Sequence, residues 1–301
     1  MKLPVVKTLQ AVIAVAFFLL SGCGGGGGGG GGDQALVPVS FNGIAASGTQ
    51  LVAVGSNGSI VTSPIGGNDW KLQASVGWDR TLQGIIWSGT QFVAIGSGIF
   101  TSTDGISWTE RHPKNTDYLY SVAWSGTEYV AVGSYGTILS SPDGITWTPR
   151  TSGTSDILQG VAWSGTQFVA VGRLGTILTS PDGLTWTTRI AGNSDSLNAI
   201  IWTGFNLVAV GANGKVLLSA DGINWTVQNA GVPESLLGVA WSGAEYVAVG
   251  SSGNSNAIVS STDGITWTRQ TVETTNGLSS IVWTGTRFVI VGWGGVILAS
   301  K

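Results

Sequence analysis

The stretch that decides the fold is Leu158–Arg189, LQGVAWSGTQFVAVGRLGTILTSPDGLTWTTR, because close copies of it recur along most of the chain. Its four short runs of apolar, β-branched and aromatic residues are separated by Ser-Gly-Thr, Gly-x-x-Gly and Asp-Gly. Such residues favour β-strands, glycine supplies the positive φ of tight turns, and Asp-Gly between apolar runs is a strong hairpin signal. The stretch therefore predicts four short antiparallel strands.

Two tryptophans mark each copy and give the period of the repeat. The first series is spaced by 37 to 42 residues: Trp87, Trp124, Trp163, Trp202, Trp241 and Trp283. The second is spaced by 38 to 42 residues: Trp70, Trp108, Trp147, Trp186, Trp225 and Trp267. Ala46 holds the first position in one earlier copy, which makes seven. Seven such units predict an all-β fold, a seven-bladed β-propeller with four-stranded antiparallel blades, in which we expect the tryptophans to pack between neighbouring blades.

The seven copies divide the region 33–301 into one propeller. We expect repeats near 42–78, 79–115, 116–154, 155–193, 194–232, 233–274 and 275–301. The last copy ends before an Asp-Gly turn, so we expect the N-terminal segment Gln34–Ser40 to supply its fourth strand and close the ring. Fourth strands form the outer edge, where proline and charges oppose edge-to-edge association. The proline and arginine residues expected on these fourth strands are Pro149, Arg111, Arg150, Arg189 and Arg269.

The first 32 residues predict a secretion signal followed by a flexible tether. Lys2 and Lys7 make the first ten residues basic. The apolar run 11–20 that follows has the length of a signal-peptide core and is too short to span a membrane. The sequence Leu-Ser-Gly-Cys ending at Cys23 resembles the lipobox of bacterial lipoproteins, which implies a signal peptide over 1–22 and acylation of Cys23. Glycines 24–32 complete a flexible tether, 23–32. In this family an aspartate directly after the cysteine signals retention in the inner membrane, and here that residue is Gly24. The resemblance therefore implies a lipid-anchored protein of the cell envelope in the outer membrane, and it leaves open whether the protein faces the periplasm or the cell surface.

Composition and charge exclude several kinds of site. One cysteine and one histidine rule out a disulfide framework and a Cys/His zinc cluster within the chain. Removal of Lys2 and Lys7 with the signal peptide leaves 11 basic residues against 16 acidic ones, a net charge of −5. Nucleic-acid binding proteins present basic patches, so this balance argues against that class. We expect a monomeric propeller with no cofactor and no metal ion.

The motif Ser-x-Asp-Gly-x-x-Trp follows the third strand of five copies. Its aspartates are Asp104, Asp143, Asp182, Asp221 and Asp263. The motif resembles the Asp-box, or BNR repeat, of sialidase-like propellers, although the family form has one more residue between aspartate and glycine. Because such an aspartate accepts hydrogen bonds from nearby backbone N–H groups, and each blade has its own, we expect these carboxylates to fix turns.

The connections between strands differ on one face of the expected propeller. Connections from first to second and from third to fourth strands are nearly uniform, and we call their face the uniform face. Connections from second to third strands, and between copies, vary in length and composition and define the variable face. We expect a ligand on the variable face, with loop drift as the alternative. The candidate ligand-facing residues are Trp78, Tyr135, Arg173, Asn213, Asn254 and Trp293.

An acidic residue precedes the first strand of five copies on the variable face. These residues are Asp79, Asp117, Asp156, Asp195 and Glu234. If the first strands line a central channel, the carboxylates could ring its mouth and attract a cation or a basic segment. The alternative is that each caps a turn.

The sequence predicts a non-enzymatic binding or scaffold propeller that engages a protein or a glycan. The sialidase resemblance implies glycoside hydrolysis as one alternative, a chemistry that uses clustered arginines and paired carboxylates. Here Arg80, Arg173 and Arg287 lie in different copies. A second alternative is an assembly chaperone, because the photosystem II assembly factors are similar seven-bladed propellers, lipid-anchored in cyanobacteria. The arginine-rich patch of that family has no evident counterpart in this sequence.

Overall fold

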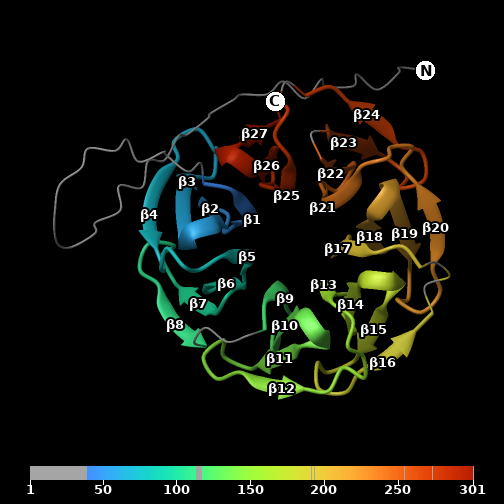
Figure 1. Cartoon of the computed structure of the whole chain (residues 1–301), viewed down its shortest axis with the longest axis horizontal. Coiled ribbons are helices and arrows are strands. Elements are labelled where there is room, and N and C mark those ends of the chain that lie inside the picture. Colours follow the sequence, from blue (N-terminus) through green and yellow to red (C-terminus); the bar gives the residue numbers. More distant parts are fainter. Residues whose placement is uncertain are drawn as a thin grey trace, which may run out of the picture.

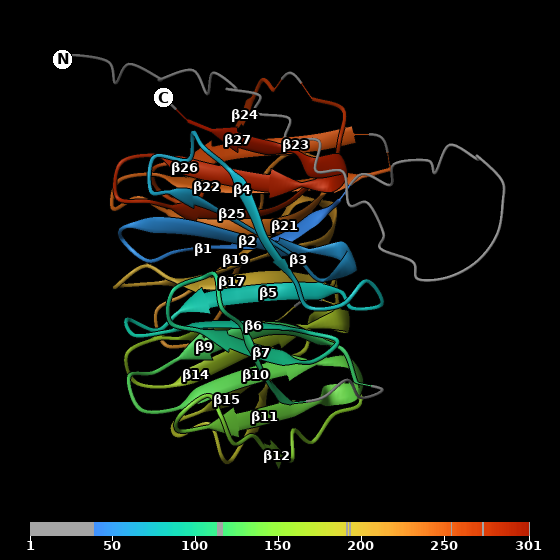
Figure 2. The ribbon, with the colours of Figure 1, turned by 90° about the vertical axis from the view of Figure 1, so that its left-hand side faces the viewer.

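The structure, a computed structural model, describes residues 39–112, 117–190, 192, 194–253, 255–272 and 274–300. Within these ranges, 27 strands and five short 3-10 turns form seven antiparallel sheets around a central axis (Figure 1). This confirms the expected all-β, seven-bladed propeller. Figure 2 shows the ring from the side, with the strands of successive blades following one another. None of the described helices is long and apolar enough to cross a membrane.

The strands of each blade follow one another in chain order, with the first innermost (Figure 1). Blade 1 contains β1 (Phe41–Ala46), β2 (Gln50–Gly55), β3 (Ser59–Pro64) and β4 (Lys71–Ser75). Blade 2 contains β5 (Leu82–Trp87), β6 (Phe92–Gly96), β7 (Ile99–Ser102) and β8 (Thr109–His112). Blade 3 contains β9 (Leu119–Trp124), β10 (Tyr129–Gly133), β11 (Ile138–Ser141) and β12 (Thr148–Arg150). Blade 4 contains β13 (Leu158–Trp163), β14 (Phe168–Gly172), β15 (Ile177–Ser180) and β16 (Thr187–Arg189).

The remaining blades repeat this order. Blade 5 contains β17 (Leu197–Trp202), β18 (Leu207–Gly211), β19 (Lys215–Ser219) and β20 (Thr226–Asn229). Blade 6 contains β21 (Ser235–Trp241), β22 (Tyr246–Ser252), β23 (Ser255–Ser261) and β24 (Thr268–Gln270). Blade 7 contains β25 (Leu278–Trp283), β26 (Phe288–Gly292) and β27 (Ile297–Ala299). The 3-10 turns are η1 (Ser56–Gly58), η2 (Ser134–Gly136), η3 (Arg173–Gly175), η4 (Ala212–Gly214) and η5 (Trp293–Gly295).

The ring is closed by packing between blades. Seven hydrophobic clusters lie in the described chain, and each joins residues of two adjacent blades. One of them joins blade 7 to blade 1 and includes Val291, Phe41 and the buried Val39. The expected closing strand at 34–40 lies mostly outside the described residues. Val39 and Ser40, which are described, are not in a strand, so the seventh sheet has three described strands.

The repeat tryptophans pack both within and between blades. In blade 3, the Trp124 and Tyr129 ring centroids are 3.9 Å apart, and those of Tyr129 and Trp147 are 6.1 Å apart. The Trp147 indole N–H donates to the carbonyl of Gly144 at 3.0 Å. The same two tryptophans contact the cluster shared with blade 2. Packing between blades is therefore only part of their role, because they also flank the aromatic residue of their own second strand.

The uniform face is a network of turn contacts. In the Asp-box of blade 2, an oxygen of Asp104 accepts hydrogen bonds from the backbone N–H groups of Ile106 and Ser107, both at 2.8 Å. The carbonyl of Asp104 in turn accepts from the Gln50 side-chain amide of blade 1 at 2.9 Å. Gln91 and Gln167 donate in the same way to the box of the following blade. Uniform sequence on this face therefore has a structural cause.

The outer arginines differ from the expected register at one position. Arg111, Arg150 and Arg189 each donate from Nε to a hydroxyl of the neighbouring third strand at 2.8 to 2.9 Å. In blade 6, Gln270 occupies this position and donates to Ser260 at 3.0 Å. Arg269 lies one residue earlier and points to a different partner, which is described below.

A glycine lies at or near the end of the second strand of every blade because the backbone at the start of the first strand lies too close for a side chain. A Cβ on any of these glycines would overlap a carbonyl oxygen at the start of the first strand, that of Ser235 in blade 6 and that of the residue before the strand in the other six blades. The glycines are Gly55, Gly96, Gly133, Gly172, Gly211, Gly250 and Gly292.

Gly172→Ala is expected to lower the free energy of unfolding by about 1–3 kcal/mol, because the new Cβ meets the backbone oxygen of Ile157. Gly66→Ala is the matched control, since its Cβ would have only the Asn68 side chain nearby, at 3.6 Å, and we expect a change within about 0.5 kcal/mol. Urea unfolding of the purified variants measures both values. Equal losses would contradict the close approach.

The Asp-boxes predict loss of stability in acid. Hydrogen bonds from the backbone N–H groups of Ser107 and Ile106 lower the pKa of Asp104 from 3.8 to about 2. The pKa values of the other four box aspartates are also lowered, chiefly by backbone N–H donors. The folded state favours the ionised carboxylate, so this stabilisation is complete above about pH 4 and disappears as the pH falls through about 2.

We therefore expect the urea midpoint of the wild type to fall more steeply than that of Asp104→Asn between about pH 5 and pH 2. The variant should be less stable than the wild type at neutral pH and approach it in acid. Parallel curves over this range would show that the carboxylate charge does not stabilise the turn.

Candidate binding face

Five connections from second to third strands share a backbone feature. The central residue of each 3-10 turn has a left-handed conformation, with φ of 54° to 63°. These residues are Asn57, Tyr135, Leu174, Asn213 and Gly294. Glycine and asparagine adopt this conformation readily, whereas for tyrosine and leucine it costs on the order of 1–3 kcal/mol. Blades 3 and 4 thus hold a strained backbone where the other turns do not.

The two strained side chains are exposed. Tyr135 is 74% exposed and Leu174 is 69% exposed, so burial of the side chain does not offset the strain. The turn η2 contacts β13 of the next blade and η3 contacts β17, so each turn leans over a neighbouring innermost strand. Strained and exposed residues on adjacent blades are typical of ligand-binding surfaces.

The expected ligand-facing tryptophans lie on the same face. Trp78, in the connection from blade 1 to blade 2, is 85% exposed. Trp293 begins η5 and is 42% exposed, and its backbone N–H donates to Gly277 at 2.8 Å. A Cβ on Gly277 would lie 2.6 Å from the Trp293 ring, so the ring rests on that glycine. The Trp293 side chain is therefore held against the scaffold and still presents an aromatic surface.

The other expected ligand-facing residues occupy similar turns. Arg173 is exposed at the start of η3, beside Leu174. Asn213 is exposed at the centre of η4, and its carbonyl accepts from the Asn229 side chain at 3.0 Å. Asn254 lies outside the described residues. Leu174 was not among the expected ligand-facing residues, although its alignment with Asn57 and Asn213 in the repeat indicates the same left-handed position.

Three acidic residues of the variable face, Asp156, Asp195 and Glu234, contact groups of their own blades. A carboxylate oxygen of Asp156 accepts from the Thr176 hydroxyl at 2.8 Å. Asp195 forms an ion pair with Lys215 at 3.1 Å. Asp117, Asp156 and Asp195 lie two residues before their first strand, and Glu234 directly precedes β21, which begins one residue earlier in its repeat. Asp79 lies three residues before β5, and Arg80 occupies the equivalent position in blade 2. None of the five acids lines the cavity of the central channel, which is formed by innermost strands.

The position occupied by Arg80 and Glu234 forms the same ion pair with opposite polarity in two blades. Glu234 is only 3% exposed and accepts from both terminal nitrogens of Arg269, at 3.1 and 2.8 Å, and from the Ser255 hydroxyl at 2.6 Å. The Arg269 hydrogen bonds are the main reason that the pKa of Glu234 is lowered. In blade 2, Arg80 pairs with Glu110 at 2.9 Å. In both blades this ion pair joins the connection that precedes the first strand to the outer, fourth strand of the same blade.

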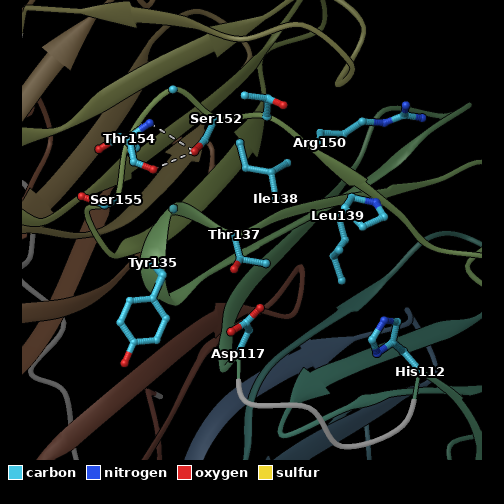
Figure 3. A pocket seen from close by; sticks show the side chains of 14 residues that line it. His112, Asp117, Tyr135, Thr137, Ile138, Leu139, Arg150, Ser152, Thr154 and Ser155 are labelled. Carbon is cyan, nitrogen blue, oxygen red and sulfur yellow. Dashed lines mark hydrogen bonds between the residues drawn. The ribbon is translucent and has the colours of Figure 1, made fainter.

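An open groove of about 580 Å³ lies on the variable face beside Tyr135 (Figure 3). Besides the ionisable His112, Asp117 and Arg150, its lining includes five serine and threonine side chains: Thr137, Thr151, Ser152, Thr154 and Ser155. Figure 3 shows Asp117 pointing toward Thr137, with Tyr135 and Arg150 at opposite ends of the groove. The groove offers many neutral hydrogen-bonding groups next to an exposed aromatic side chain.

The arginines outside the outer strands lie apart from one another. Arg173 and Arg80 lie on the variable face in different blades, whereas Arg287 donates to the Gly66 carbonyl on the uniform face, at 3.4 Å. Among the residues described, no group of three or more His, Cys, Asp and Glu side chains is placed to hold a metal ion. The geometry of the variable face therefore suits binding through aromatic, aliphatic and hydroxyl groups.

No protein-family model matches the chain, and no curated protein is significantly similar to it in sequence. Solved structures of similar fold include YCF48 bound to a D1 peptide, with a TM-score of 0.71 and 18% identity over 88% of this chain and 92% of that one. YCF48 from Cyanidioschyzon merolae has a TM-score of 0.68 and 19% identity over 88% of this chain and 96% of that one. At this identity the likeness shows the fold alone.

Replacement of the strained tyrosine should stabilise the protein. Tyr135→Asn places at η2 the residue that η1 and η4 already use, so we expect the free energy of unfolding to rise by about 1 kcal/mol. The reciprocal control, Asn213→Tyr, should lower it by a similar amount. Denaturant titration measures both, and a destabilised Tyr135→Asn would mean that the tyrosine supports the fold.

Proposed function

We propose that this protein is a non-enzymatic binding propeller that recognises an exposed segment of a partner protein with its variable face. The observation that carries the proposal is the pair Tyr135 and Leu174, exposed side chains held on strained backbone in adjacent blades. Trp78 and Trp293 extend the same surface. Exposed aromatic side chains on rigid supports are the usual anchors of protein interfaces, because they bury a large area with little loss of entropy.

Several features favour binding over catalysis. The arginines that a sialidase-like reaction would require lie apart, and Glu234, Asp195 and Asp156 have partners within their own blades. Glycoside hydrolysis uses two carboxylates that flank the scissile bond, whereas these three carboxylates are each engaged by a hydrogen bond or an ion pair within the blade. Hydrolysis of a sialoside by the purified protein would contradict this part of the proposal.

A peptide segment is the ligand that the similar structures support. One of these propellers was solved bound to a D1 peptide. The groove beside Tyr135 has a hydroxyl-rich lining that can accept and donate hydrogen bonds to a peptide backbone. An assembly-factor role for this chain is the second candidate, and titration with a D1 peptide tests it directly.

We further propose that Cys23 is acylated and anchors the propeller to the bacterial envelope through the glycine tether. The support is the order of basic start, apolar run, small residues and cysteine in the sequence. Cys23→Ala should move the protein from the membrane to the soluble fraction on cell fractionation. Unchanged membrane association would contradict the anchor.

The binding face is tested by comparing partners captured from native membranes. Trp78→Ala/Tyr135→Ala/Trp293→Ala should reduce the amount of each specific partner by about tenfold or more, because such aromatic anchors dominate interface energies. The control variant Ile106→Ala/Ile145→Ala/Ile223→Ala removes exposed apolar side chains of the uniform face. Quantitative mass spectrometry measures both.

The two variants distinguish binding on the variable face from binding on the uniform face. Loss with the first variant and retention with the control supports the variable face. Retention with the first variant and loss with the control would place binding on the uniform face. Unchanged thermal unfolding of both variants shows that the losses report on binding rather than on folding.

A further inference from the structure

The central channel contains a cavity of about 280 Å³ that the proposed binding face does not explain. The innermost strands of all seven blades contribute to its lining. Every side chain described as lining it is uncharged. At ~30 Å³ for each water molecule, the space is that of about nine waters.

Every innermost strand carries a β-bulge where it enters the channel. In six blades the register with the second strand shifts between the first and third residues of the innermost strand, and in blade 6 it shifts between the second and fourth. The residue between these two positions is the extra one. A bulge re-aims the side chain of the inserted residue. In blades 1 to 5 this residue is polar and lines the cavity, and we call these five the polar arc: Asn42, Gln83, Tyr120, Gln159 and Asn198.

The two ends of the polar arc are fixed by contacts with the following blade. The Asn42 side-chain N–H₂ donates to the Leu82 carbonyl at 2.9 Å, and that of Asn198 donates to the Leu236 carbonyl at 2.8 Å. Each of these amides therefore retains its oxygen as an acceptor. The ends of the arc are rigid, and their remaining groups are acceptors.

The three side chains in the middle of the polar arc have donors and acceptors that are not paired with any described residue. The side chains of Gln83, Tyr120 and Gln159 form no hydrogen bond with any described residue, and all three are only partly exposed. Each can both donate and accept. Three consecutive blades therefore present unused neutral donors and acceptors to one curved wall.

We propose that this cavity binds one neutral sugar residue. A cyclic polyol carries hydroxyl groups around its rim, each able to donate and accept, which matches an arc of amides and a phenol on a curved wall. An extended peptide presents its polar groups along two edges and would leave part of the arc unpaired. A charged ligand would lose its hydration without gaining an opposite charge, which is costly.

The test uses neutral sugars as probes on the purified protein. Glucose, galactose and N-acetylglucosamine are titrated by saturation-transfer NMR, with N-acetylneuraminic acid as the charged comparison and N-acetylglycinamide as the peptide-like one. We expect at least one neutral sugar to bind and the two comparison compounds not to bind. Its disaccharide distinguishes the two sources of the same chemistry, since equal binding means that the end of a glycan enters the channel and weaker binding means a free monosaccharide.

Variants of the polar arc locate the binding. Gln83→Ala, Gln159→Ala and Tyr120→Phe should each weaken the affinity about three- to tenfold, as expected for loss of one neutral hydrogen bond. Tyr118→Phe is the matched control, because it removes the same hydroxyl from an exposed tyrosine two positions away, which does not line the cavity. Tyr118→Phe should leave the affinity unchanged.

Three results would overturn the proposal. The first is no binding of any neutral sugar at tens of millimolar. The second is binding of N-acetylglycinamide in place of a sugar. The third is sugar binding that survives the arc variants but is lost in Trp78→Ala/Tyr135→Ala/Trp293→Ala, which would mean stacking on exposed aromatic rings. Because that last variant leaves the channel intact, partner capture and sugar binding fail independently.

Discussion

The packing of each blade against the next is the constraint on which the rest of the structure depends. A four-stranded sheet of this size cannot bury its apolar faces alone, and seven clusters, one for each neighbouring pair, bury them between sheets. The cluster between blade 7 and blade 1 makes the ring closed rather than open. Val39 belongs to it, so the chain that enters the first blade also strengthens the last contact of the ring.

The two faces of the ring contribute differently to this packing between blades. On the uniform face, Gln50, Gln91 and Gln167 follow the turn after the first strand of their blades and donate to the Asp-box of the next blade. Changes there affect blade packing. On the variable face the turns are anchored mainly through their backbones, so their side chains are free to differ. Tyr135 keeps a left-handed conformation that asparagine occupies in blades 1 and 5, and backbone strain held at a functional surface is a common trade between stability and function.

Much of the fold could be predicted from the sequence because each structural requirement recurs with every repeat. The two tryptophan series, the Ser-Gly-Thr turns and the Asp-Gly turns fix the number of blades and the order of their strands. The glycine at the end of each second strand was visible as a pattern, but its reason was not, since the overlap involves backbone of another strand. Ring closure by Gln34–Ser40 stays a prediction, because most of that segment lies outside the described residues.

The candidate site was less predictable for specific reasons. Arg269 aligns with the outer arginines to within one residue, yet a one-residue shift gives it Glu234 as a partner. Side-chain pairing across a blade is not encoded in local spacing. The polar arc was missed because a bulge interrupts the simple alternation of a strand, and the sequence around Gln83 and Gln159 reads as regular strand. The left-handed position of Leu174 was available from alignment with the asparagines of blades 1 and 5.

The proposed function requires that partner proteins contact the variable face. The most direct measurement places a photo-crosslinking amino acid at Tyr135 and, separately, at Ile145, an exposed residue of the uniform face in the same blade. Crosslinked partners are then identified in native membranes. We predict specific crosslinks from position 135 and none from position 145. Crosslinks to the same partner from position 145 alone would contradict the account.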